Sequence, residues 1–330
     1  MLTRRVLAVL AFAFAFAAAS SSLAAARAAD DALSLVPADA ASVAVIRFNE
    51  LRSSPLAGRL FSDADHIHGD GEAARFLEES NLKPREDVDT VVLVGLVPSG
   101  SDTPALALFE GRFDPERLGA AARSRGATKV SDYYRVPEKG SARHGGPQAV
   151  AFVSPRLIVA GSESAVVAAL AARGAGGTTF SAGAGLGRQL SRIDRSASMW
   201  ALVDVTRYPA IQKGLGRSGA AHSGGSEAAG ALLGAMKSVT LFSFQATVHA
   251  DDLAVTASGV SPDAETRQLL EDSLRGVIAM WRLAASEKSP EIVAVLRKFK
   301  IESDQDTVTV RGTLPGSVVR SLADKRSASR

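Results

Sequence analysis

The densest group of side chains that could do chemistry lies at 63–72, where two histidines alternate with carboxylates. His66, His68 and Asp70 approach the H-x-H-x-D spacing of metallo-hydrolases, in which two imidazoles and a carboxylate bind a divalent ion. Gly71 stands where that pattern has its next histidine. A polar loop leading into a helix with acids in its first turn would have the same composition. We therefore keep these three residues as candidate metal ligands beside that structural interpretation.

Other reactive motifs fit structural roles better than catalytic ones. The glycine-rich run 183–187 lacks the strand that should precede a dinucleotide-binding turn. Ser162 is not in a G-x-S-x-G elbow and is placed to begin a helix, while His144 and His249 have no evident aspartate partner.

Asp114 and Asp204 could form a carboxylate pair for acid–base chemistry, but each suits a cap or turn at the end of a strand. We therefore expect a non-enzymatic protein without a cofactor.

The amino-acid composition indicates a globular protein and excludes chemistry that depends on cysteine. The chain has 330 residues, 46% of them hydrophobic and 22% charged, which is typical of globular domains. It has no cysteine, which excludes disulfides, thiol catalysis and Cys-ligated metal centres.

The N-terminus has the three parts of a secretory signal peptide: Arg4 and Arg5, an apolar run at 6–19, and a small-residue cleavage pattern at 26–28. We expect cleavage after residue 28 and export to the periplasm or the medium. An uncleaved N-terminal anchor is the alternative.

Loss of 1–28 lowers the basic count from 38 to 35, equal to the 35 acidic residues. The mature chain is then formally neutral, which disfavours a nucleic-acid partner. We expect no membrane span after the leader.

Hydrophobic periodicity predicts alternating strands and helices in both halves. The strands expected are 42–48, 89–97, 105–113, 129–136, 148–153, 156–160, 199–205, 239–248, 253–260 and 307–311. The helices expected are 72–82, 115–126, 163–173, 227–236, a long one after 261–263, one starting at 290, and 316–323.

The two halves share an element order and some residues, which indicates an internal duplication. Arg52 and Arg207 are separated by the same 155 positions as Glu72 and Glu227. Chance matching of short apolar segments is the alternative. We expect a first repeat at 29–175, a Gly-rich linker at 176–190 and a second repeat at 191–330. Each repeat is expected to be α+β, a mostly antiparallel sheet with helices packed on it.

This layout resembles the uncharacterised duplicated exported bacterial proteins of a domain-of-unknown-function type. The segments that carry the resemblance, beside the leader, are 36–39, 52–56, 111–114 and 157–162. They are structural motifs, so the resemblance implies a fold and no activity.

The sequence therefore predicts an exported, non-enzymatic protein with a binding or scaffolding role, whose partner is an unknown protein or a small apolar ligand. A first alternative is a lipid carrier, with a cleft between the sheet and the long helix whose apolar face includes Leu270, Ile278, Trp281 and Leu283. A second alternative is a metal-dependent hydrolase that uses the His66, His68 and Asp70 loop.

Overall fold

The structure is a computed structural model that describes residues 32–52, 54, 56, 71–97, 104–137, 147–173, 179–208, 238–285 and 290–327. The candidate ligands His66, His68 and Asp70, the leader and the helix expected at 227–236 lie outside these residues.

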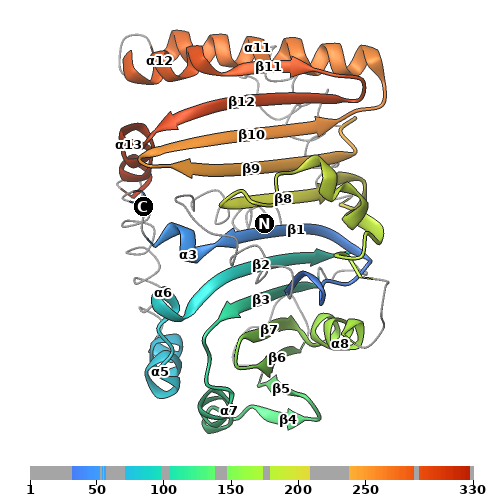
Figure 1. The fold of residues 1–330 in the computed structure, drawn as a ribbon, viewed down its shortest axis with the longest axis vertical. Helices are drawn as coiled ribbons and strands as arrows, with labels where there is room; N and C mark the ends of the chain where they lie inside the picture. The colour runs from blue at the N-terminus through green and yellow to red at the C-terminus, as the bar shows by residue number, and fades with distance from the viewer. Residues whose placement is uncertain are drawn as a thin grey trace, which may run out of the picture.

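The described strands form a single twelve-stranded sheet in which every pair of neighbours is antiparallel (Figure 1). In spatial order they are β11 (Lys300–Ser303), β12 (Thr307–Pro315), β10 (Asp252–Val260), β9 (Leu241–His249), β8 (Met199–Asp204), β1 (Ala40–Arg47), β2 (Val88–Leu96), β3 (Ala105–Gly111), β7 (Leu157–Ser162), β6 (Gln148–Ser154), β5 (Tyr133–Val136) and β4 (Thr128–Val130). The architecture is thus α+β with a large antiparallel sheet.

The central pair β1–β8 joins the two halves of the chain, with Ala44 opposite Ala201. One sheet was predicted for each half, and this pairing merges them. Without it, each half would expose a long apolar edge strand, which is an aggregation hazard. Outward from β1 the order is β2, β3, β7, β6, and outward from β8 it is β9, β10, β12, β11.

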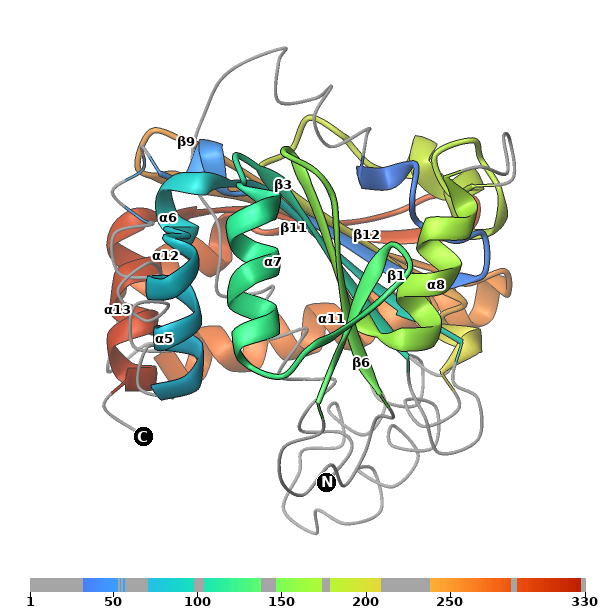
Figure 2. The ribbon, with the colours of Figure 1, turned by 90° about the horizontal axis from the view of Figure 1, so that it is seen from below.

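Helices cover both faces of the sheet, and Figure 2 shows α7 and α8 on opposite sides of the first-half strands. Adjacent residues of a strand point to opposite faces, so Val45 packs in the largest core cluster while Ile46 packs in a second cluster. The helices are α3 (Phe48–Leu51), α5 (Gly71–Ser80), α6 (Pro84–Asp87), α7 (Pro115–Ser124), α8 (Glu163–Ala172), η2 (Gly185–Arg192), η3 (Val205–Arg207), α11 (Ala264–Ala285), α12 (Pro290–Lys298) and α13 (Gly316–Ser327). Among the described helices, none combines the length and the apolar character needed to cross a bilayer.

The largest core cluster is centred on Trp200 of β8, which is 1% exposed and stacks on the fully buried Phe180 with ring centroids 6.5 Å apart. Gly187 of η2 is needed at this contact, because a Cβ there would lie 2.0 Å from the carbonyl oxygen of Phe180. Gly185 has a φ of +53°, and a Cβ there would lie 2.0 Å from the carbonyl oxygen of Ala38. The glycine run therefore permits close packing of η2 on the core.

Three sequence-based predictions need correction. The single strand expected at 129–136 is a hairpin, β4–β5, because Ser131 takes a left-handed turn conformation with a φ of +54°. The short strand β11 was not predicted. Trp281 and Leu283, which the helical spacing placed on one apolar face with Leu270 and Ile278, are 60% and 77% exposed, because they lie in the last turn and a half of α11, beyond Ile278.

Three polar residues at the hairpin end of the sheet need separate description. Ser162 stands at the N-cap of α8, but its hydroxyl makes no capping hydrogen bond. Tyr133 and Tyr134 are neighbours on β5, and both are half-buried. The two side chains lie on opposite faces of β5, and helices cover both faces at this end of the sheet.

Candidate functional site

The sheet opens at its β4 end, between the β4–β5 hairpin and strand β6. Strand β5 pairs with β6 only through Tyr134–Val150, Arg135–Ala149 and Val136–Gln148. Strand β6 continues to Ser154, so its last residues have no strand beside them on the hairpin side. Figure 2 shows the hairpin between α7 and α8 at this end of the molecule.

A cleft of about 610 Å³, which we call the hairpin cleft, lies at this opening. Its apolar lining is half-buried: Tyr134, Phe152, Val153 and Leu170. Its basic side chains are exposed: Arg123, Lys129 and Arg173. The acidic side chains of the lining, Glu116 and Asp132, are also exposed, and Pro115 and Ser131 complete it.

The aromatic part of the hairpin cleft is held by close packing against α7. The rings of Tyr134 and Phe152 lie 5.6 Å apart at an interplanar angle of 53°. Gly119 of α7 lets the tyrosine approach the helix, since a Cβ at this position would lie 2.7 Å from the Tyr134 hydroxyl oxygen. Asp114 fixes the start of the same helix by accepting hydrogen bonds from the backbone N–H groups of Glu116 and Arg117. The aromatic wall of the cleft is therefore closely packed against α7.

The opposite face of β5 is tied to α8 by charge. Glu163 accepts a hydrogen bond from the Tyr133 hydroxyl at 2.6 Å and from the Arg135 guanidinium at 2.6 Å. These bonds, with Arg135 the larger cause, lower the pKa of the Glu163 carboxyl below its ordinary value. This contact fixes the hairpin from behind.

Arg135 is paired with Glu163, but the three basic side chains of the hairpin cleft are not paired in this way. Within the part of the chain that the structure describes, Arg123, Lys129 and Arg173 make no side-chain hydrogen bond or ion pair. Cationic groups in this state are available to an anion that enters the cleft.

A second cleft, of about 500 Å³, lies where the ends of α5, β3 and β6 converge on the start of α7. It is lined by Arg112, Arg117 and Arg156 together with Asp87 and Asp114. Its polar groups already serve the fold: Arg112 donates to the carbonyl of Glu86, Arg117 to that of Glu79, and Asp114 caps α7. It lacks the half-buried aromatic pair, so the hairpin cleft is the better candidate for a ligand.

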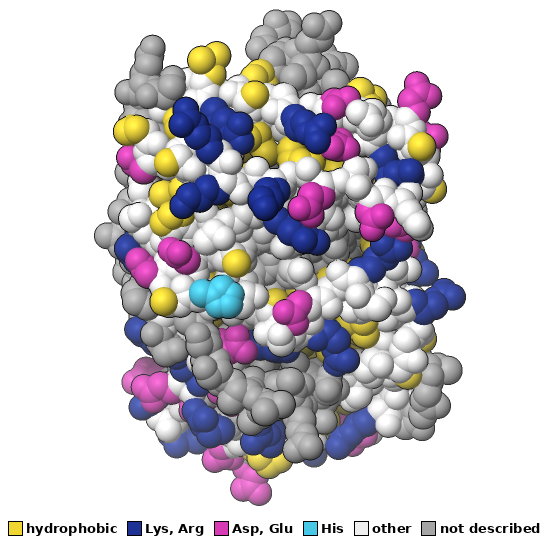
Figure 3. Space-filling model, turned by 45° about the horizontal axis from the view of Figure 1, so that its top comes forward, with side chains coloured by type: hydrophobic (Ala, Val, Ile, Leu, Met, Phe, Trp, Pro, Cys, Tyr) yellow, Lys and Arg dark blue, Asp and Glu magenta, His cyan; other side chains and the backbone are white. Residues whose placement is uncertain are grey.

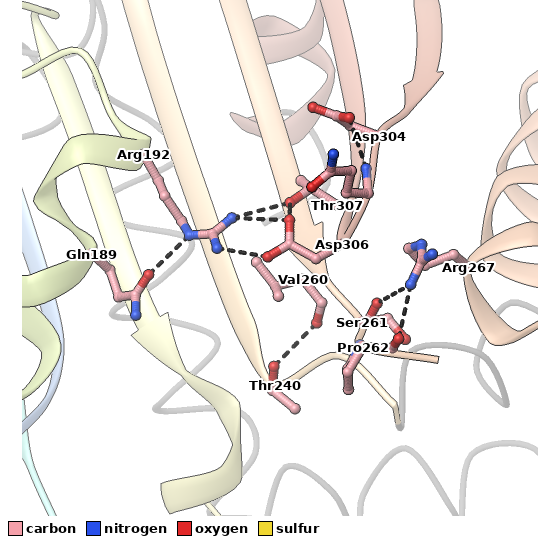
Figure 4. Close-up of polar contacts among 11 residues, drawn as sticks. Gln189, Arg192, Thr240, Val260, Ser261, Pro262, Arg267, Asp304, Asp306 and Thr307 are labelled. Carbon is pink, nitrogen blue, oxygen red and sulfur yellow. Dashed lines mark hydrogen bonds and ion pairs between the residues drawn. The ribbon is translucent and has the colours of Figure 1, made fainter. Parts of the chain in front are cut away.

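A polar contact in the second half is structural (Figure 4). Arg192 of η2 donates to the Asp306 carboxylate at 2.7 Å and to the Thr307 hydroxyl at 3.1 Å, while its Nε donates to Gln189. Arg192 lowers the pKa of Asp306 to about 2, with a smaller contribution from Thr307. The contact ties η2 to the start of β12.

The basic run at 297–300 does not form a separate positive surface. Figure 3 shows acidic side chains (magenta) among the lysines and arginines (dark blue) on one face of the molecule. Arg311, which stands opposite Lys300 in the β11–β12 pair, lies 3.4 Å from Glu302.

The other predicted site residues separate into two groups. His66, His68 and Asp70, and also His144, fall outside the described residues. Within the described residues, no three His, Asp or Glu side chains are grouped to hold a metal ion. Asp204 accepts hydrogen bonds from Thr206 and caps η3, as Asp114 caps α7, so each carboxylate serves its own helix. Neither of the two clefts lies beneath α11.

Sequence reasoning missed the residues of the hairpin cleft because it treated 129–136 as one strand. A signal was present: Ser131 and Asp132 are turn formers between a lysine and a tyrosine pair. The contribution of Leu170 and Arg173, from a helix further along the chain, had no local signal.

Comparison with known proteins gives similarity at the level of structure only. No family model matches the chain, and no curated protein matches it significantly. Three crystal forms of a protein called TP0453 are similar to 88–89% of this chain and 95–97% of that one, at 10–11% sequence identity. Their TM-scores are 0.48, 0.43 and 0.40.

Proposed function

We propose that this is an exported, non-enzymatic bacterial protein that binds a small ligand in the hairpin cleft. The observation that carries the proposal is the cleft itself, in which half-buried aromatic rings lie beside exposed basic side chains. Such a mixture of apolar lining and a few polar groups is typical of ligand sites. The hairpin cleft replaces the space beneath α11 as the place where we look for a small apolar ligand.

We also propose that the two halves arose by duplication. The matching strand order on the two sides of the β1–β8 pair supports this. So does the pairing register: Ala44 faces Leu93 of β2, which faces Ala107 of β3, and Ala201 faces Phe244 of β9, which faces Ala257 of β10. The hairpin β4–β5 lies beyond β6, whereas β11 ends the other side of the sheet. Among the described strands this hairpin has no counterpart in the second half, and an element added to one copy can take on function because the strands common to both copies already form the sheet.

The non-enzymatic role is tested with purified residues 29–330 and chromogenic carboxylic esters, phosphomonoesters and peptide amides. We expect product release no faster than in buffer alone. Saturable turnover would contradict the proposal. Turnover that a chelator and the substitution His66→Ala both abolish would establish the metal-dependent hydrolase instead.

Export is tested separately by fusing residues 1–28 to an alkaline phosphatase that lacks its own leader. The enzyme folds only after export because it needs disulfides, so we expect phosphatase activity in a bacterial host. A matched fusion with Arg4→Glu and Arg5→Glu should be inactive. Equal activity of the two fusions would contradict the assignment of the leader.

A further inference from the structure

We infer that the ligand of the hairpin cleft is a flat apolar molecule that carries an anionic group, either a phosphate or a carboxylate. This inference rests on the binding role proposed above and names the class of ligand. It combines two features of the cleft, its aromatic surface and its excess of basic side chains.

The apolar part of the ligand has a defined surface on which to lie. Tyr134 and Phe152 are half-buried, so each keeps part of its ring accessible, and they meet at 53° and do not stack flat. Val153 and Leu170 belong to the same lining but pack with the largest core cluster, on the α8 side of the sheet, whereas Phe152 packs on the α7 side. A flat ring system of the ligand would bury its apolar surface against the accessible parts of the Tyr134 and Phe152 rings. Aromatic side chains in proteins pack against each other in the same way.

The anionic group has basic partners on three separate elements. Arg123 is in the last turn of α7, Lys129 is on β4, and Arg173 directly follows α8. Arginine forms two parallel hydrogen bonds to a phosphate or carboxylate, and lysine adds a mobile point charge. Three cations on three elements can surround one anion, which a row of cations on a single helix face could not do.

Two acidic side chains weaken the attraction between the cleft and an anionic ligand, and they provide a way to tell an anionic ligand from a cationic one. Glu116 and Asp132 lie in the lining of the same cleft, so the net excess is one positive charge. An anionic ligand is favoured only if its charge lies closer to the basic side chains than to the carboxylates of Glu116 and Asp132. Removal of the Asp132 charge should therefore strengthen binding, whereas it would weaken binding of a cationic ligand.

The experiment is equilibrium dialysis of residues 29–330 against 1-naphthyl phosphate, with 1-naphthoate, 1-naphthalenemethanol and inorganic phosphate as comparison probes. We expect the naphthyl phosphate to bind with a Kd below about 1 mM, as suits a ligand of its size. The two naphthyl anions distinguish phosphate from carboxylate. The neutral alcohol and the inorganic phosphate should each bind at least about tenfold more weakly. The alcohol can contact the aromatic side chains but has no charge for the basic ones, and inorganic phosphate has the charge but no ring.

The matched variants are Arg123→Gln with Lys129→Gln, and Arg297→Gln with Lys300→Gln. Each pair removes an arginine from the last turn of a helix and a lysine from an edge strand of the sheet, at opposite ends of the sheet. The first pair should weaken binding of naphthyl phosphate at least about tenfold, and the second should leave it unchanged. Asp132→Asn should strengthen binding about twofold to fivefold.

The inference is overturned if the wild-type protein does not bind either naphthyl anion, if both double variants bind alike, or if the neutral alcohol binds as well as the anions. The same dialysis samples report free naphthol. Naphthol release would contradict the non-enzymatic role, whereas absent binding without naphthol would contradict only this inference. Circular dichroism of each variant checks that it is folded.

Discussion

The two ends of the sheet follow the same strand order from the centre outward and then differ. Beyond β6 the chain adds the short hairpin β4–β5, which leaves a cleft lined by half-buried rings. At the other end, β11 is the last strand, and α11 and α12 pack against β11 and β12 (Figure 1). One end of the sheet thus packs against the long helix α11 and against α12, while the other holds a hairpin between α7 and α8 with a cleft beside it. The central strands therefore follow one plan in both halves, and the segments added at the two ends of the sheet make those ends different.

The two tryptophans of the chain should differ more in their contribution to stability than any other pair of residues compared below. Trp200 is 1% exposed in the central strand β8, whereas Trp281 is 60% exposed on α11. Trp200→Ala should lower the free energy of unfolding by about 3–5 kcal/mol through the cavity it leaves. Trp281→Ala should change it by less than about 0.5 kcal/mol. Urea unfolding measures both, and a large loss in Trp281→Ala would place that residue in a core after all.

A smaller difference in stability is expected between Gly→Ala substitutions at two glycines. Gly111 lies at the end of β3, and Gly259 lies near the end of β10, the strand in the corresponding position of the sheet order. A Cβ on Gly111 would lie 1.9 Å from the backbone oxygen of Asp87, whereas a Cβ on Gly259 would lie 3.3 Å from a Val239 methyl. Gly111→Ala should cost about 3 kcal/mol, because backbone must move. Gly259→Ala should change stability by less than about 1 kcal/mol, since a side chain can yield. Equal losses in chemical denaturation would show that the two strand ends are equally tight.

The smallest effect concerns the Arg192–Asp306 contact and depends on pH. Because the folded-state pKa of Asp306 is lowered from 3.8 to about 2, its stabilising contribution is present above pH 4 and is lost as pH falls toward 2. The Asp306 side chain is 46% exposed, so solvent screening limits the contribution to less than about 1 kcal/mol. The stability difference between wild type and Asp306→Asn should therefore shrink between pH 6 and pH 2.5. A difference that is constant or grows on acidification would contradict this assignment.

Much of the fold could be predicted from local patterns. Alternating apolar residues placed β1, β2, β3 and β8 to within a few residues, and the Asp114-Pro115 start of α7 was correct because a cap is a local signal. The single sheet could not be predicted in this way, because the β1–β8 pairing joins segments more than 150 residues apart. Trp281 had the right helical spacing for a core residue, but spacing does not tell where a helix runs past the sheet.

The candidate site was less accessible to sequence reasoning than the fold. The metal-ligand pattern at His66 attracted attention because its residues are close in the sequence, and it stays a prediction. The hairpin cleft takes Arg123, Tyr134, Phe152 and Arg173 from four elements, and only the tertiary structure brings them together. Sites of this kind are assembled by topology, so their residues show no spacing rule.

Binding of a ligand in the hairpin cleft can be observed by ¹⁹F NMR of protein labelled with 3-fluorotyrosine. The chain has three tyrosines, so the spectrum should hold three signals, which Tyr→Phe variants assign. Tyr134 lines the cleft, Tyr133 faces Glu163 behind it, and Tyr208 is buried against Ser42 far along the sheet. Titration with 1-naphthyl phosphate should move the Tyr134 signal most, move Tyr133 less and leave Tyr208 unchanged. A response of Tyr208 alone, equal responses of all three signals, or no response at saturating probe would contradict the account.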